Sequence, residues 1–89
     1  MTAPTSRLIS SARLQPAPED RGWLFDARRG ALMSLNRSAF AIATALQQGA
    51  DDKTIAAALT KRFGLAEELA LIEVRAFAQR MKELLLAAE

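Results

Sequence analysis

The sequence predicts an α+β fold in which a three-stranded antiparallel sheet is followed by three helices. Apolar and polar residues alternate up to residue 35, as in half-buried strands, and from residue 37 apolar residues recur at helical spacing. Strands and helices do not alternate along the chain, which argues against a doubly wound parallel sheet. The 89 residues suffice for one domain. We expect it over residues 7–89, after a flexible terminus at residues 1–6.

The first predicted strand, over residues 7–15, is weakly patterned because serine and alanine dilute its alternation. Such a strand is expected at an edge of the sheet. Pro16 and Pro18 follow, in a segment that we expect to be a loop as far as Gly22. Proline lacks the N–H group that a sheet ladder needs, so this segment should not pair.

A hairpin is predicted over residues 22–35. In its first strand Trp23 and Phe25 share one face, and we expect Trp23 to pack the sheet against a helix. Residues 27–30 read as the turn, in which Asp26 bonds back to the backbone and Gly30 takes a positive φ. We expect Arg28 and Arg29 to form a solvated tip. The returning strand places Ala31, Met33 and Leu35 on one side and Leu32 and Ser34 on the other.

Three helices are predicted after the hairpin. Asn36 is the expected N-cap of the first, which Gly49 ends. Asp51 or Asp52 begins the second, which Gly64 ends, and the third continues towards the C-terminus. The expected inner stripes are Ala39, Ile42, Ala43 and Leu46; Ile55, Ala58, Leu59 and Phe63; and Val74, Phe77, Ala78, Met81, Leu84 and Leu85.

The composition argues against catalysis. The chain has no cysteine, histidine or tyrosine, so it lacks disulfides, thiolate metal sites and the usual general base. We therefore expect no enzyme activity, no metal and no cofactor, and a cytoplasmic location. The net charge of +2 is mild, so no nucleic-acid partner is expected. No apolar run is long enough to span a membrane.

An ordered set of residues resembles the PqqD-like family, the leader-peptide recognition elements of pathways that make and modify ribosomal peptides. It consists of Leu35-Asn36 opening the first helix, Gly49 ending it, and the tail Ile72-Glu73-Val74-Arg75-Ala76-Phe77. The resemblance covers about residues 23–86 and is greatest to the stand-alone leader-binding proteins of lasso-peptide clusters. Glu73 stands where the family usually has aspartate. The other matching positions are Ala39, Ile42, Ile55, Leu59, Phe63 and Met81.

The resemblance implies a winged-helix-like fold and a mechanism. The leader of a precursor peptide would dock as an extra strand on the third strand, beside the third helix, and be delivered to a modifying enzyme such as a leader peptidase. An exposed strand edge has unpaired N–H and C=O groups, which supports this reading independently. The predicted peptide-binding residues are Ala31, Leu32, Met33 and Ser34 for the backbone, Val74, Phe77, Ala78 and Met81 for the apolar side, and Arg75, Arg80 and Lys82 for acidic leader residues.

Other interpretations remain open at this stage. Phe77 and Met81 fit a plain hydrophobic core as well as a ligand cleft. A winged-helix DNA-binding regulator is the alternative function, with residues 52–63 as recognition helix. That helix would begin with two aspartates, which repel DNA, and expose Ala56, Ala57 and Thr60. An uncovered edge strand also pairs with a second copy, so both a monomer and a homodimer are compatible with the sequence.

Overall fold

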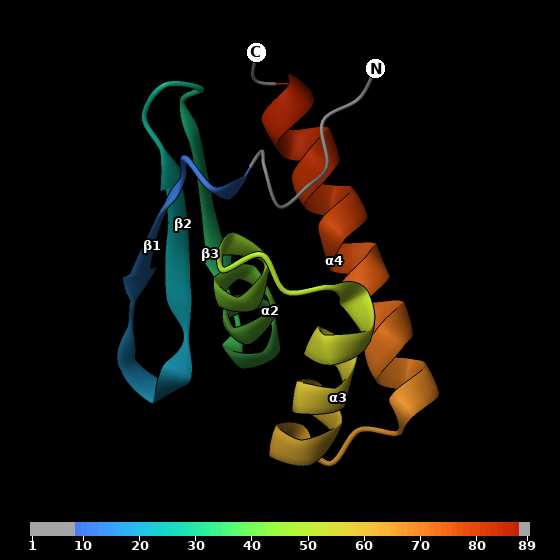
Figure 1. Ribbon diagram of the computed structural model, residues 1–89. Helices are drawn as coiled ribbons and strands as arrows, with labels where there is room; N and C mark the ends of the chain where they lie inside the picture. The colour runs from blue at the N-terminus through green and yellow to red at the C-terminus, as the bar shows by residue number, and fades with distance from the viewer. Residues whose placement is uncertain (1–8, 88–89) are drawn as a thin grey trace.

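The computed structural model describes residues 9–87 and confirms the α+β architecture, with a three-stranded antiparallel sheet in the order β1-β2-β3 and three helices after it. Figure 1 shows the sheet on one side and α4 on the other, with α2 between them. The predicted flexible terminus, residues 1–6, lies outside the described residues, and the winged-helix likeness stays a prediction. The elements are β1 (Arg13–Pro16), η1 (Pro18–Asp20), β2 (Gly22–Asp26), β3 (Ala31–Leu35), α2 (Arg37–Gln47), α3 (Asp52–Phe63) and α4 (Glu67–Ala87).

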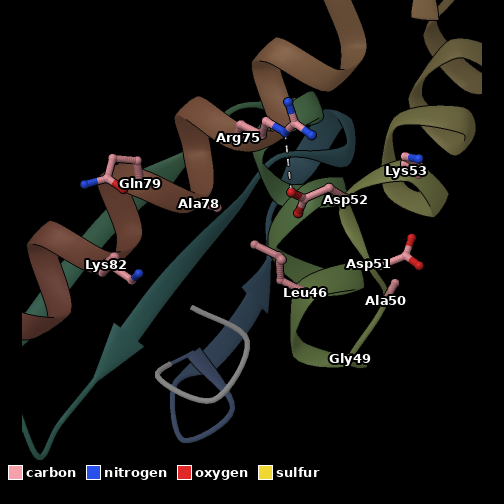
Figure 2. Close-up of a pocket in the computed structure, with 10 residues that line it drawn as sticks. All are labelled: Leu46, Gly49, Ala50, Asp51, Asp52, Lys53, Arg75, Ala78, Gln79 and Lys82. Carbon is pink, nitrogen blue, oxygen red and sulfur yellow. Dashed lines mark ion pairs between the residues drawn. The ribbon is translucent and has the colours of Figure 1, made fainter. Parts of the chain in front are cut away.

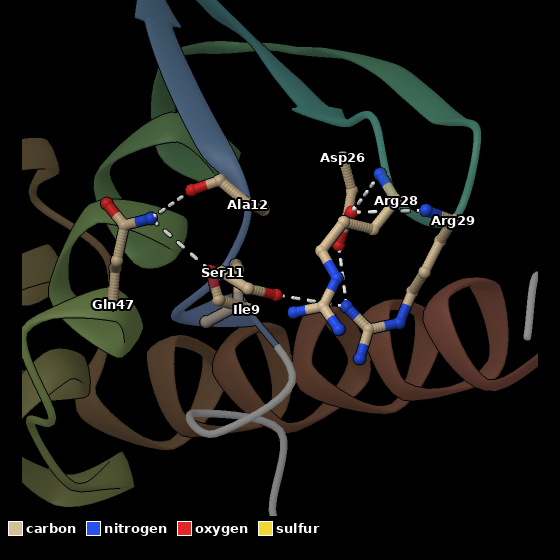
Figure 3. Close-up of polar contacts among 7 residues, drawn as sticks. All are labelled: Ile9, Ser11, Ala12, Asp26, Arg28, Arg29 and Gln47. Carbon is tan, nitrogen blue, oxygen red and sulfur yellow. Dashed lines mark hydrogen bonds and ion pairs between the residues drawn. The ribbon is translucent and has the colours of Figure 1, made fainter.

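The first strand is shorter than predicted. Within the described part of residues 7–15, the strand occupies only residues 13–15 and then continues to Pro16, which lies opposite Gly22. The prediction that the segment from Pro16 to Gly22 would not pair is therefore wrong at its two ends, and proline is tolerated there because it ends an edge strand. Residues 9–12 form a tight turn instead, closed by a 3.0 Å bond from the Ala12 N–H to the Ile9 carbonyl. The Gln47 side-chain amide, on α2, donates to both carbonyls that flank this turn, as Figure 3 shows.

The hairpin is confirmed. β2 and β3 pair in the register Gly22↔Leu35 through Asp26↔Ala31, and Gly30 has φ 67°. The Asp26 carboxylate accepts hydrogen bonds from the backbone N–H groups of Arg28 and Arg29, at 3.1 and 3.2 Å. This carboxylate therefore holds the turn, as its place before the turn residues predicted.

Arg29 does not belong to a solvated tip, so that prediction is wrong for this residue. Its guanidinium lies 2.6 Å from the second oxygen of Asp26 and also donates to the Ser11 hydroxyl, as Figure 3 shows. Burial raises the pKa of Asp26, but the hydrogen bonds from Arg29 and Arg28 and the Arg29 charge outweigh it and lower the pKa overall. Asp26 is 1% exposed, so this pair is a buried ionic link between turn and core.

The predicted helix caps are confirmed. Asn36 Oδ1 accepts from the Ala39 N–H at 2.9 Å, and Asp51 Oδ1 accepts from the Thr54 N–H at 2.8 Å. The bonds from Thr54 lower the pKa of Asp51. Gly64 ends α3 with φ 72°, a left-handed conformation that glycine adopts without strain. These caps fix where each helix begins and ends.

The inner face of the sheet belongs to Leu24 and not to Trp23. Leu24 is fully buried, whereas Trp23 is 45% exposed on the opposite face, so the expectation that Trp23 packs against a helix is wrong. The reason lies in Gly22, since a Cβ there would overlap the ring of Phe40 on α2. Gly22 therefore lets Phe40 lie close to the backbone of β2, on the face that also bears the buried Leu24 and Asp26.

Helix α3 also differs from its predicted stripe at one position. Ile55 and Leu59 are buried as expected, but Ala56 is buried in place of Ala58, which is exposed. Helix α3 packs against both α2 and α4, so its buried surface is wider than a single stripe. The prediction that the recognition helix of the DNA-binding alternative would expose Ala56 is wrong too, because Ala56 is buried.

Candidate peptide-binding site

Strand β3 is an open edge in the sheet that the described residues form. It pairs with β2 on one side and ends the strand order on the other. Figure 1 shows that β3 is the strand on the side of the sheet towards α4. The other edge strand, β1, is shorter and ends in proline, and these features weaken it as a template. The five-residue, proline-free β3 is thus the better edge for an added strand.

The side chains of β3 alternate as predicted. Leu32 is 64% exposed on the outer face, whereas Ala31 is buried and Met33 is half-buried on the face towards the helices. Because residues alternate along a strand, a peptide paired with β3 would place one set of side chains beside Leu32 and the other beside Met33. Ser34, exposed beyond Leu32, leaves room for a larger side chain of the peptide.

The predicted apolar residues of α4 lie in the core. Val74, Phe77 and Met81 are between 0 and 2% exposed, while Ala78 is half-buried. These three side chains lie together with Ala70 and Leu85 on one face of α4, which packs along α3. They therefore have no exposed surface that a docked peptide would contact in this conformation.

The predicted cations of α4 do not gather on one side. Arg75 and Lys82 line a hollow of about 850 Å³, which Figure 2 shows between α4, the end of α2 and the start of α3. Ala78 lines the same hollow, and Arg75 Nε lies 3.6 Å from an Asp52 carboxylate oxygen. Arg80 follows Arg75 by five residues, which turns it by about 140° around the helix and away from this group. No residue of β3 lines the hollow.

The start of α3 is acidic on its surface. Asp51 caps the helix and Asp52 faces Arg75, so the helix end that would meet DNA in the alternative function carries two carboxylates. Among residues 9–87, no cluster of three or more acidic or other ligating side chains could hold a metal ion. Nor does any helix of that range have the length and apolar character needed to cross a membrane.

One surface was missed by sequence reasoning, the outer face of the sheet. Trp23, Phe25 and Leu32 are each at least 44% exposed there, and Phe25 lies directly opposite Leu32 across β2 and β3. The alternation of Trp23 and Phe25 put both on one face, but it did not say which face the helices would cover. The glycine before Trp23 was the signal that would have found it.

Comparison with known proteins identifies one family. Residues 22–86 match the sequence model of one family, which is described as coenzyme PQQ synthesis protein D (PqqD). The match runs from the start of β2 nearly to the end of α4. No curated protein and no solved structure matches the chain. The family match takes in β3 and α4, the two elements of the candidate site, and leaves out β1. Because the match covers well over half of the chain, the protein belongs to the PqqD family.

Proposed function

We infer a peptide-binding accessory role in the biosynthesis of PQQ or a related modified peptide, because the protein belongs to the PqqD family. We propose that this protein binds the leader segment of a ribosomally made precursor peptide as an added β-strand on β3. It then delivers the peptide to a modifying enzyme, such as the leader peptidase of a lasso-peptide pathway. The observation that carries the proposal is the unpaired, proline-free edge of β3 in a PqqD-family chain.

The binding contacts follow from the geometry of β3. Ala31, Leu32, Met33 and Ser34 form the binding edge, on which two alternate residues direct their N–H and C=O groups outward to the peptide. Selectivity comes from the side chains beside Leu32 and Met33. Met33 offers an apolar, adaptable contact on the face towards the helices. The peptide should thus carry an apolar residue at the position that lies beside Met33.

The residues of α4 have two roles in this proposal. The buried side chains of Val74, Phe77 and Met81 pack in the core and hold α4 in place. Ala78, Arg75 and Arg80 lie nearer the surface, where the cations attract acidic leader residues and raise the association rate. The whole unit, residues 7–89, acts as one binding domain in the cytoplasm and needs no cofactor.

The test is a fluorescence-anisotropy titration with the labelled leader of the precursor peptide encoded nearest this protein. Adjacent amides of an antiparallel strand point to opposite sides. Of the variants Leu32→Pro and Met33→Pro, one therefore removes an outward donor and the other a donor to β2. We expect one variant to retain its melting temperature within a few degrees and to lose binding, and the other to unfold.

A matched control separates the backbone from the side chain. Leu32→Thr keeps the amide and introduces a β-branched residue that suits a strand, so it should bind within about fivefold of the parent protein. The proposal is wrong if the proline variant that remains folded binds the leader with an unchanged Kd. Binding to duplex DNA that weakens steeply with salt would favour the regulator instead.

A further inference from the structure

Three arginines from distant parts of the chain meet on one surface of the molecule. Arg21 follows η1, Arg37 begins α2 and Arg62 lies near the end of α3. Arg21 and Arg62 line a groove of about 340 Å³ between the β1–β2 loop, α2 and α3. Arg21 and Arg37 line an adjoining hollow of about 350 Å³. None of the residues 31–34 lines either of them.

The floor of the groove is apolar. Phe40, Ala41 and Ala45 of α2 face Ile55, Ala58 and Leu59 of α3 across it. A groove with this floor favours apolar side chains, and the arginines at its rim favour negative charge. Such a combination suits an amphipathic protein segment better than a nucleic acid, whose backbone offers little apolar surface.

One aromatic ring holds two of the arginines. The guanidinium carbons of Arg37 and Arg62 lie 5.7 and 5.1 Å from the centre of the Phe63 ring, within the range of cation–π contacts. The ring thus keeps two positive charges on one side of the groove. Both side chains remain more than half exposed and accessible to a ligand.

Among the residues 9–87 that line these two surfaces, Asp20 is the only one with a carboxylate. Its Oδ2 lies 3.7 Å from Arg37 Nη2 and 3.8 Å from Arg62 Nη2, beyond hydrogen-bond distance, and its side chain is 59% exposed. Ion pairs of this length and exposure are weak. Asp20 and the preceding Glu19 have φ values of 62° and 64°, a left-handed conformation that residues other than glycine rarely adopt, in a loop closed by a 2.8 Å bond from the Ala17 N–H to the Arg21 carbonyl.

We propose that this groove docks an acidic, apolar segment of a partner protein. A carboxylate of the segment replaces Asp20 between Arg37 and Arg62, and its apolar side chains lie on the floor formed by α2 and α3. Carboxylates pair well with arginine because two N–H groups of the guanidinium match their two oxygens. Arg21 also lines a third hollow with Ser34, at the end of β3, but residues 31–33 line none of these surfaces. The protein can therefore hold a peptide strand at residues 31–33 and a second protein segment together. The inference does not rest on the proposed leader binding.

The experiment is an NMR titration of the full, ¹⁵N-labelled chain with a blocked hexapeptide of alternating glutamate and leucine. We expect saturable shifts of amides in the groove, at Arg21, Ala41, Ala45 and Arg62. A peptide of glutamine and leucine should cause none, because it lacks the charge. The proposal is overturned if the two peptides act alike, if the shifts fall on residues 31–34, or if an oligonucleotide shifts the groove and the acidic peptide does not.

Three variants sharpen the test. Arg62→Gln should weaken binding of the acidic peptide about tenfold, since a hydrogen bond to a charged partner is lost. Lys61→Gln is the matched control, because it removes the same charge from the next, exposed position of α3 and should change Kd less than about twofold. Asp20→Asn should tighten binding about twofold by freeing the arginines. Equal weakening by Arg62→Gln and Lys61→Gln, with folding unchanged, would reduce the effect to net charge and contradict the proposal.

Discussion

The inner face of α4 and the outer face of the sheet both bear large apolar side chains, but they differ in their exposure to solvent. Phe77 and Met81 are fully enclosed, while Trp23 and Phe25 are nearly half exposed. Sequence reasoning expected a helix over Trp23 and allowed a ligand at Phe77. The difference shows that periodicity predicts which residues share a face, but the covering element decides which face is buried.

For the sheet, the deciding contact is small. Gly22 allows Phe40 of α2 to lie against the backbone of β2, so the helix covers the side that bears Leu24. For α4, the deciding partner is α3, which packs along the face that bears Val74 and Phe77. With both faces covered in this way, the exposed aromatic side chains and the β3 edge are surfaces that stay accessible to a binding partner.

The largest expected effect is a difference in the free energy of unfolding between alanine substitutions on the two faces. Phe77→Ala should lower the free energy of unfolding by about 3–5 kcal/mol, because it leaves a cavity in the core. Phe25→Ala, the same change on the outer face, should cost less than about 1 kcal/mol. Urea unfolding followed by circular dichroism measures both, and a Phe77→Leu variant should fall between them. Similar losses for Phe77→Ala and Phe25→Ala would show that the faces are assigned incorrectly.

A smaller effect tests the buried polar link at the inner face. Asp26→Asn should destabilise the protein by about 1–3 kcal/mol at pH 7, because Arg29 and two turn amides lose a charged acceptor. The pKa of Asp26 is lowered in the folded state. Its contribution is therefore complete above the unfolded value of about 3.9 and is lost as the pH falls through the folded value.

The measurement is urea unfolding of the parent and Asp26→Asn proteins at pH 7, 5 and 3. We expect a similar difference between the two proteins at pH 7 and 5, and a smaller one at pH 3. A difference that stays constant down to pH 3 would mean that the Asp26 charge does not stabilise the turn.

Much of the fold was predictable because it depends on local chemistry. Asn36 and Asp51 cap helices through their own side chains, and Gly30 and Gly64 take the conformations that their positions require. The segment 9–12 was not predictable, since its turn is held by Gln47, more than thirty residues away. Long-range contacts of this kind leave no periodic signal in a single sequence.

The candidate site divides in the same way. A meander of three strands leaves its last strand at an edge of the sheet, so the sequence was sufficient to predict that residues 31–34 lie on an edge strand. Residues of α4 were grouped by their spacing and by the resemblance to the PqqD-like family, and the structure separates Arg80 from Arg75 and encloses Phe77. Burial depends on what packs against the helix, which no spacing within α4 reveals.

The most direct test of the central claim, that the backbone edge of β3 binds the peptide, is amide hydrogen exchange with and without the leader peptide. If the peptide adds a strand, exchange should slow at least about tenfold at two alternate positions among residues 31–34, either 31 and 33 or 32 and 34. The residues of α4 should change much less. Slower exchange confined to α4, with residues 31–34 unchanged, would contradict the account.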